Sequence, residues 1–153
     1  MLRFLASLAF IALFSVAASA SPATLTVTVG GQDKVFSIEE LEALGLTNFQ
    51  TTTTWTDGAQ LFEGVLLSDI AKAYGIDKGT VTVTAINAYA ADIDIGEVLS
   101  VPVMLATRMN GERMSVRDKG PFWVVYPRDT LPDYADERHN YKWVWQVSSL
   151  KFQ

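Results

Sequence analysis

The sequence predicts a single β-rich α+β domain with mixed sheets and two or three short helices. Most apolar residues alternate with polar residues or stand in runs of strand length, which is the pattern of a sheet. Turn-forming steps such as Gly30-Gly31 and Asn110-Gly111 separate these runs, and such steps favour tight hairpins. Helical spacing with capping residues occurs only in short stretches, so strands are expected to supply most of the core.

The chain after position 20 begins with a predicted hairpin and a short helix. Leucine and valine alternate with threonine over 25–29, and residues 34–36 pair back after the glycine turn. Ser37 and Glu40 have the spacing of a capping box, in which each side chain binds the backbone N–H of the other residue. Gly45 is expected to end this helix.

The central stretch predicts a strand, a turn, a second strand and a helix. Residues 50–55 contain four threonines and a tryptophan, and residues 61–67 are mostly apolar. The turn lies between them at 56–58. Ser68 is the predicted N-cap of the helix, which is expected to stop at Gly75.

The second half begins with a predicted strand over 81–86, covered on both faces. The segment 92–95 alternates Asp with Ile, so its two carboxylates should point the same way. A helical turn is predicted over 96–100, followed by a hairpin of residues 103–108 and 112–116.

The last segments are two predicted strands separated by a long polar loop. Residues 122–127 are apolar, and 128–142 is polar and contains the one histidine of the chain. A strand over 141–147 should place its two tryptophans on one face, and a bulge is expected at 148–149.

Residues 1–20 have the composition of a secretory signal. Arg3 supplies the positive start, residues 5–16 are apolar, and Ala18-Ser19-Ala20 forms a small-x-small cleavage site. Residues 21–153 then form one domain. Arg3 has no neighbouring arginine, so we expect export by the general secretory route and a periplasmic or secreted protein.

Composition narrows the partners of this domain. The chain has a net charge of −5, which argues against nucleic acid as a partner. It has no cysteine, so no disulfide can form. After position 20, no apolar stretch approaches the roughly 18 residues of a membrane span, and no transmembrane segment is predicted there.

Several short motifs, in order, resemble the oxidoreductase molybdopterin-binding domain family. They are Phe62 to Leu67 leading into a helix, Leu105-Ala106, Asn110-Gly111, Gly120-Pro121, and a strand ending at Pro127. The resemblance implies the fold of sulfite oxidases and of the periplasmic methionine sulfoxide reductase catalytic subunit. It covers nearly all of residues 21–153.

The resemblance also implies a molybdenum cofactor held by a cysteine thiolate, and here the chain departs from the family. The corresponding position falls on Thr51, within a residue, and a neutral hydroxyl does not replace a thiolate as a soft donor. Family enzymes that carry molybdopterin out of the cytoplasm have twin-arginine signals, which this chain lacks. We therefore predict no cofactor, although the family itself implies molybdopterin.

No residue is predicted to be catalytic or to bind a metal, because the chain has no phosphate-binding glycine loop, H-E-x-x-H or G-x-S-x-G motif. Aromatic and polar residues near predicted strand ends instead suggest a ligand site. Its six candidates are Thr51, Trp55, Asn87, Tyr89, Arg128 and His139.

Two charged groups have alternative interpretations. Arg108, Arg113, Arg117 and Lys119 form either an anion site or a solvated hairpin surface. The aspartates of 92–95 are either a functional pair or part of an exposed strand face.

The leading hypothesis is an exported module that binds an unknown small molecule or an envelope protein, without molybdenum redox activity. The alternative is a periplasmic oxidoreductase that keeps a pterin cofactor through a ligand other than cysteine, with Asp57, Arg128 and His139 as first suspects. A purely structural subunit that docks a membrane or sensor protein is the third hypothesis.

Overall fold

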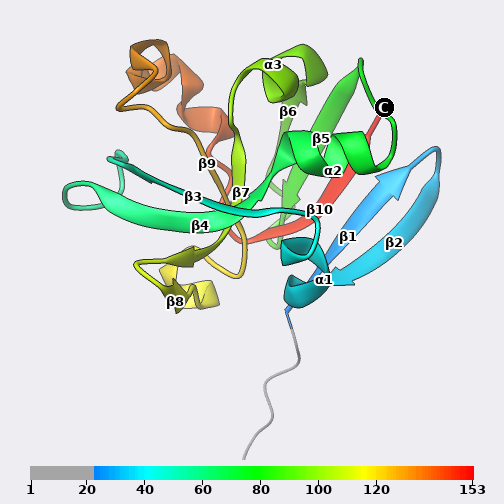
Figure 1. Cartoon of the computed structure of the whole chain (residues 1–153), viewed down its shortest axis with the longest axis horizontal. Helices are drawn as coiled ribbons and strands as arrows, with labels where there is room; N and C mark the ends of the chain where they lie inside the picture. The colour runs from blue at the N-terminus through cyan, green and yellow to red at the C-terminus, as the bar shows by residue number, and fades with distance from the viewer. Residues whose placement is uncertain (1–22) are drawn as a thin grey trace, which may run out of the picture.

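The computed structural model describes residues 23–153, and the predicted signal segment 1–20 lies outside them. The first of two five-stranded sheets has the order β2-β1-β10-β5-β6 (Figure 1). Its strands are β1 (Thr24–Val29), β2 (Gln32–Ser37), β5 (Thr80–Ala85), β6 (Ala90–Asp94) and β10 (Val147–Phe152). Strand β1 pairs parallel with β10 and antiparallel with β2, so this sheet is mixed, as predicted.

The second sheet is antiparallel and has the order β3-β4-β7-β8, with β9 paired to β7. Its strands are β3 (Leu46–Thr51), β4 (Gln60–Leu66), β7 (Met104–Met109), β8 (Glu112–Arg113) and β9 (Trp123–Val125). An isolated bridge between Trp123 and Trp145 brings β9 next to the residues that precede β10. The two sheets therefore meet close to these tryptophans.

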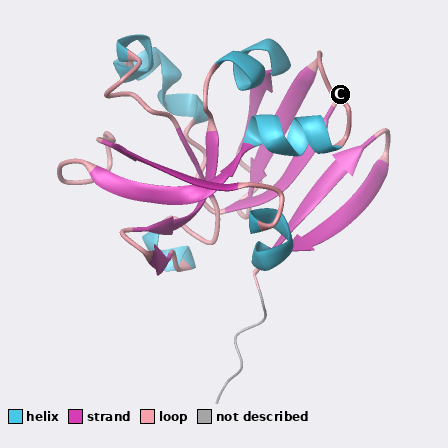
Figure 2. Ribbon diagram, in the orientation of Figure 1, coloured by secondary structure: helices cyan, strands magenta, loops and turns pink. Residues whose placement is uncertain are grey.

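Three short α-helices cover parts of the sheets (Figure 2). They are α1 (Ile38–Glu42), α2 (Leu67–Ala73) and α3 (Ile95–Ser100). Three 3-10 helices also lie in the described chain: η1 (Val116–Asp118), η2 (Pro132–Ala135) and η3 (Glu137–Lys142). The β-rich α+β fold class is thus confirmed.

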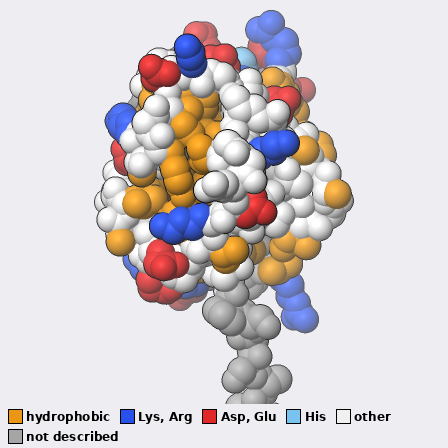
Figure 3. All heavy atoms as spheres, turned by 90° about the vertical axis from the view of Figure 1, so that its right-hand side faces the viewer, with side chains coloured by type: hydrophobic (Ala, Val, Ile, Leu, Met, Phe, Trp, Pro, Cys, Tyr) orange, Lys and Arg blue, Asp and Glu red, His pale blue; other side chains and the backbone are white. Residues whose placement is uncertain are grey.

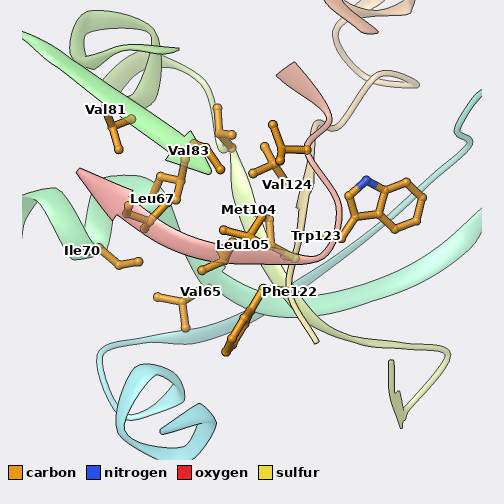
Figure 4. Close-up of a cluster of buried hydrophobic side chains, with 14 of the residues drawn as sticks. Val65, Leu67, Ile70, Val81, Val83, Met104, Leu105, Phe122, Trp123 and Val124 are labelled. Carbon is orange, nitrogen blue, oxygen red and sulfur yellow. The ribbon is translucent and has the colours of Figure 1, made fainter. Parts of the chain in front are cut away.

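The core lies between the sheets and under α2. Val65, Leu67 and Ile70 come from β4 and α2, and they share this core with Val83 of β5 and Leu105 of β7 (Figure 4). All five side chains are buried. Burial of this apolar surface is the main stabilising term of the fold.

Local signals in the first hairpin and helix agree with the structure. Gly30 and Gly31 both have positive φ, at 58° and 78°, as a two-residue hairpin turn needs. The Ser37 side chain accepts a hydrogen bond from the N–H of Glu40 at 3.2 Å, and the Glu40 carboxylate accepts one from the N–H of Ser37 at 2.8 Å. The capping box is therefore confirmed.

The predicted N-cap of α2 at Ser68 is wrong. The N-cap is Leu66, and Ser68 lies inside the helix, where it is buried. Strand β4 runs directly into α2, and the N–H of Leu67 donates to the carbonyl of Val103 at 2.9 Å. This tertiary bond satisfies an N–H at the helix start that a capping side chain would otherwise bind.

Three predicted strands are also corrected. The strand predicted over 50–55 is β3, which ends at Thr51. The strand predicted over 81–86 has one buried face, because its residues alternate between buried and half-buried. The return strand predicted over 112–116 is limited to β8 and is followed by η1.

The strand predicted over 141–147 does not form. Helix η3 extends to Lys142, and Gln146 adopts a positive φ of 53° just before β10. Its N–H donates to Lys119 O at 2.9 Å and its side-chain amide to Val116 O at 2.7 Å. These long-range bonds hold the bend, and the register shift between Val147 and Ser149 confirms the predicted bulge.

We expect Gly64→Ala to weaken the β4–β7 pairing. An added Cβ at Gly64 would lie 2.2 Å from the carbonyl oxygen of Leu105 and 2.7 Å from Cα of Ala106, so the backbones would have to separate. We predict a loss of about 2 kcal/mol in the free energy of unfolding, measured by urea denaturation.

Gly58→Ala is the matched control, because nothing lies within 4 Å of its added Cβ and only its φ of +66° is unfavourable. That substitution should cost about 1 kcal/mol. A Gly64→Ala variant as stable as the Gly58→Ala variant would contradict the steric explanation.

Candidate functional site

A cavity of about 300 Å³ lies where β5, the loop after it and the segment before β10 meet. Five aromatic side chains line it: Trp55, Tyr89, Tyr141, Trp143 and Trp145. Its remaining lining residues are Ala85, Asn87, Asn140 and Val144, so no charged side chain belongs to the lining. We call this space the aromatic cavity.

Trp55 brings the two sheets together at the aromatic cavity. It lies in the loop after β3, and its ring centroid is 5.4 Å from that of Trp145 and 5.8 Å from that of Trp143. A further edge-to-face contact, at 6.3 Å, joins it to Trp123 of β9. Edge-to-face packing is a favourable geometry for aromatic pairs, so this cluster fixes the position of the cavity wall.

Tyr89 lines the aromatic cavity from a tight loop between β5 and β6. Ala88 has a φ of 67°, and the Asn87 side chain accepts a hydrogen bond from the N–H of Tyr89 at 3.0 Å. The Tyr89 hydroxyl donates to the carbonyl of Tyr141 at 2.9 Å. This bond ties the β5–β6 loop to the end of η3.

A buried ion pair anchors η3 to α3. Lys142 Nζ lies 2.6 Å from one carboxylate oxygen of Glu97, and the Tyr126 hydroxyl donates to the other at 2.9 Å. Burial would lower the pKa of Lys142, but its hydrogen bond and attraction to Glu97 prevail and raise it. Burial and the Glu97 carboxylate both raise the pKa of Tyr126, so this phenol stays protonated and can donate.

Thr51 and Arg128 lie on two segments that are hydrogen-bonded to each other, and neither residue lines the aromatic cavity. Thr51 is fully buried, and its hydroxyl donates to Thr52 O at 3.3 Å and accepts from the N–H of Asp129 at 3.4 Å. Arg128 donates to the Thr54 hydroxyl at 3.1 Å. The threonine run is thus tied to residues 128–129.

His139 and Asp57 lie in two other hollows. His139 packs against Tyr134, with ring centroids 5.0 Å apart, and its Nδ1 is enclosed without a hydrogen-bond partner. Asp57 lines a second cavity, of about 370 Å³, together with Arg117, Lys119 and Trp55. We call this the charged cavity.

Three of the six predicted ligand residues therefore share one space. Trp55, Asn87 and Tyr89 line the aromatic cavity, whereas Thr51, Arg128 and His139 do not. The other four polar and aromatic lining residues were not among the six candidates, although the loop over 128–141 was expected near the ligand; they are Asn140, Tyr141, Trp143 and Trp145. The run of aromatic residues over 141–145 was the available signal, but it was interpreted as strand.

Four of the charged residues singled out in the sequence have structural partners. Arg108 and Arg113 both bind the Glu42 carboxylate, which speaks against the anion-site alternative for these two residues. Hydrogen bonds from Arg113 and Thr107 lower the pKa of Glu42 although its burial acts to raise it. Asp92 accepts from the Thr82 hydroxyl at 2.6 Å and Asp94 caps α3, which supports the strand-face interpretation of 92–95.

Among residues 23–153, no group of three or more His, Cys, Asp or Glu side chains is placed to hold a metal ion. None of the helices described there is long and apolar enough to cross a membrane.

A separate hollow lies at the end of the molecule that carries the β1–β2 hairpin and the C-terminus, where apolar side chains gather (Figure 3). Val29, Ile76 and Phe152 line a space of about 350 Å³ there, together with Lys78 and Asp77. It shares no lining residue with the aromatic cavity.

Comparison with known proteins assigns the family. Residues 15–151 match the oxidoreductase molybdopterin binding domain. The chain belongs to this family. The matched range begins at residue 15, inside the segment predicted as a signal.

The fold is similar to that of part of a longer protein of known structure. The crystal structure of the sulfane dehydrogenase SoxCD from Paracoccus pantotrophus is similar, with a TM-score of 0.62 and 18% sequence identity. The similarity covers 84% of this chain but 37% of that chain, so this protein spans well under half of that one. No curated protein matches the sequence.

The donor set of this family member does not fit a thiolate-bound molybdenum cofactor. The chain has no cysteine, and the buried hydroxyl of Thr51 is already bound to two backbone groups. A neutral hydroxyl in that setting is a hard, weak donor where a soft thiolate is required.

We expect Glu97→Gln to loosen the segment that carries Asn140, Tyr141 and Trp143. The substitution leaves the Lys142 ammonium, whose side chain is 9% exposed, without its anion. Removing one partner of a buried pair is strongly destabilising, and we predict a loss of about 3 kcal/mol in unfolding free energy, measured by thermal and urea denaturation.

The pH dependence of this loss provides a control. Because the pair raises the pKa of Lys142 above its ordinary 10.5, the difference from wild type should be complete at neutral pH and shrink as the pH rises past that value. Glu137→Gln, on an exposed residue of η3, should leave stability unchanged. Equal stability of the two variants would show that the ion pair does not hold η3.

Proposed function

We propose that this family member is an exported ligand-binding module that works without molybdenum redox chemistry. The observation that carries the proposal is the aromatic cavity, a space of about 300 Å³ walled by five aromatic rings and free of charged side chains. Cavities of this size, mostly apolar with a few polar groups, are typical small-molecule sites. Asn87 and Asn140 are the polar groups of this one.

The chemistry at Thr51 supports the loss of electron transfer through molybdenum. Its hydroxyl donates a hydrogen bond to the carbonyl of Thr52 and accepts one from the N–H of Asp129, and the residue is fully buried. The predicted signal over 1–20 supports the same conclusion, because a chain threaded unfolded through the membrane arrives without a preinserted cofactor.

Exposed rings at the mouth of the cavity favour a ligand or partner that approaches from solvent. Tyr89, Tyr141 and Trp145 are 47%, 51% and 37% exposed. Large exposed aromatic side chains that gather at one place are characteristic of binding surfaces. A protein partner docking on this rim is the less favoured form of the proposal, because the cavity beneath it suits a small molecule.

The second candidate is an oxidoreductase that retains a pterin cofactor through a ligand other than cysteine. Family membership favours it. The positions of the residues considered for this role argue against it, because Asp57, Arg128 and His139 line no common cavity among those described.

Elemental analysis separates the two candidates. We predict that the protein purified from its native compartment carries only background molybdenum by inductively coupled plasma mass spectrometry. A cysteine-containing member of the family, purified in parallel, should carry the metal and serves as the positive control. Stoichiometric molybdenum in this protein would reject the leading proposal and support the second.

Export has its own test. We predict that the protein recovered from the cell envelope or medium starts at Ser21, shown by intact mass and N-terminal sequencing. Ala20→Gln should block this processing, because the cleavage site requires a small residue. Recovery of the uncleaved chain from the cytoplasm would contradict the proposal.

A further inference from the structure

We propose that the aromatic cavity takes a compact organic cation of the quaternary ammonium class. This inference rests on the proposed binding function and adds to it the chemical class of the ligand. The cavity itself supplies the argument, through the inclination of its rings, the charge of its lining and the polar groups near its rim.

The inclination of the rings suits a rounded group better than a flat one. The plane of Trp55 is inclined by 76° to that of Trp145 and by 56° to that of Trp143. A flat ligand stacks best between parallel faces, whereas inclined faces form corners. A trimethylammonium head in the cavity is rounded, so it can contact rings of different inclination without needing a pair of parallel faces.

The charge of the lining also selects a cation. Aromatic faces carry partial negative charge and attract cations that lie within about 6 Å of the ring centre. The lining contains no Lys, Arg or His that would repel a cation. It also contains no Asp or Glu that would bind a proton or a metal ion instead. The net charge of the whole chain, −5, favours approach of a cation from solvent.

One cation of the protein already uses this geometry. Lys142 Nζ lies 5.7 Å from the centre of the Tyr141 ring. Its charge is balanced by Glu97 at 2.6 Å, so it adds little repulsion inside the cavity. The ring faces of Trp55, Trp143, Trp145 and Tyr89 have no cation–π partner among the described residues.

Asn87 and Asn140 fit the other end of such a ligand. Both are neutral, and Asn87 uses its carbonyl oxygen for the N–H of Tyr89, which leaves its NH₂ group to donate. A hydroxyl or carboxylate one or two carbons from the ammonium nitrogen can accept from these amides. The cavity thereby suits a quaternary ammonium alcohol or acid.

The test compares choline with the uncharged alcohol in which a carbon atom replaces its nitrogen. The two have nearly the same shape, so any difference in affinity reports charge. We expect choline chloride to bind about tenfold more tightly by isothermal titration calorimetry and tryptophan fluorescence. Tetramethylammonium should bind as well, since the ammonium head is the recognised group.

Variants locate the site. Trp145→Ala should weaken choline binding about tenfold, and Trp145→Phe, which keeps a weaker ring, should lie between. Val35→Ala, on an exposed residue of β2 outside the cavity, should bind as wild type does. Circular dichroism confirms that each variant is folded, and Tyr141→Ala gives a second removal of a ring.

The outcomes separate the inference from the function on which it rests. If the uncharged alcohol or a flat probe such as indole binds at Trp145 as tightly as choline or more tightly, the cation inference is overturned and the binding module stands. If choline, tetramethylammonium, the uncharged alcohol and indole all fail to bind, both are overturned. Choline binding that Trp145→Ala leaves unchanged also overturns the inference, because the site then lies elsewhere.

Discussion

The packing of Trp55 against three other tryptophans is the contact on which the site depends. Trp55 follows β3 of the second sheet, whereas Trp143 and Trp145 precede β10 of the first. Trp123 of β9 packs against both, with its ring centroid 6.3 Å from that of Trp55 and 6.4 Å from that of Trp143. Because these rings come from separate sheets, the cavity exists only when both sheets are formed and docked. The fold and the site are therefore one cooperative unit.

The sequence predicted elements whose determinants are local. The Ser37 capping box depends on residues three positions apart, and the pairing of β1 with β2 depends on two adjacent glycines. The prediction from sequence was wrong where a hydrogen bond to a distant backbone group took the place of a local signal. Leu67 starts α2 with a bond to Val103, and Gln146 is bent by bonds to residues 116 and 119. Alternation of apolar residues carries no information about such bonds, so 141–147 resembled a strand.

The same distinction explains which parts of the site were predictable. Trp55 and Tyr89 were chosen because they follow strand ends, where loops carry function, and both line the aromatic cavity. Asn140 lies in a polar stretch without a local motif, and the Glu97–Lys142 pair that places it joins residues 45 positions apart. Thr51 was chosen by resemblance to a cysteine position, and its two backbone bonds give it a structural role here.

The aromatic cavity and the charged cavity share Trp55, but only the second is lined by charged side chains. This difference decides which substitution best tests the ligand class. Arg117 and Lys119 line the charged cavity, and the ammonium of Lys119 lies 5.5 Å from the centre of the Trp123 ring. Asp57 and Asp118 line the charged cavity as well, so its two basic and two acidic side chains balance, whereas the lining of the aromatic cavity has no charged side chain. Removing Trp55 would alter both spaces at once. Trp145 lines the aromatic cavity and not the charged cavity. A change in ligand binding after removal of its ring therefore reports on the aromatic cavity alone.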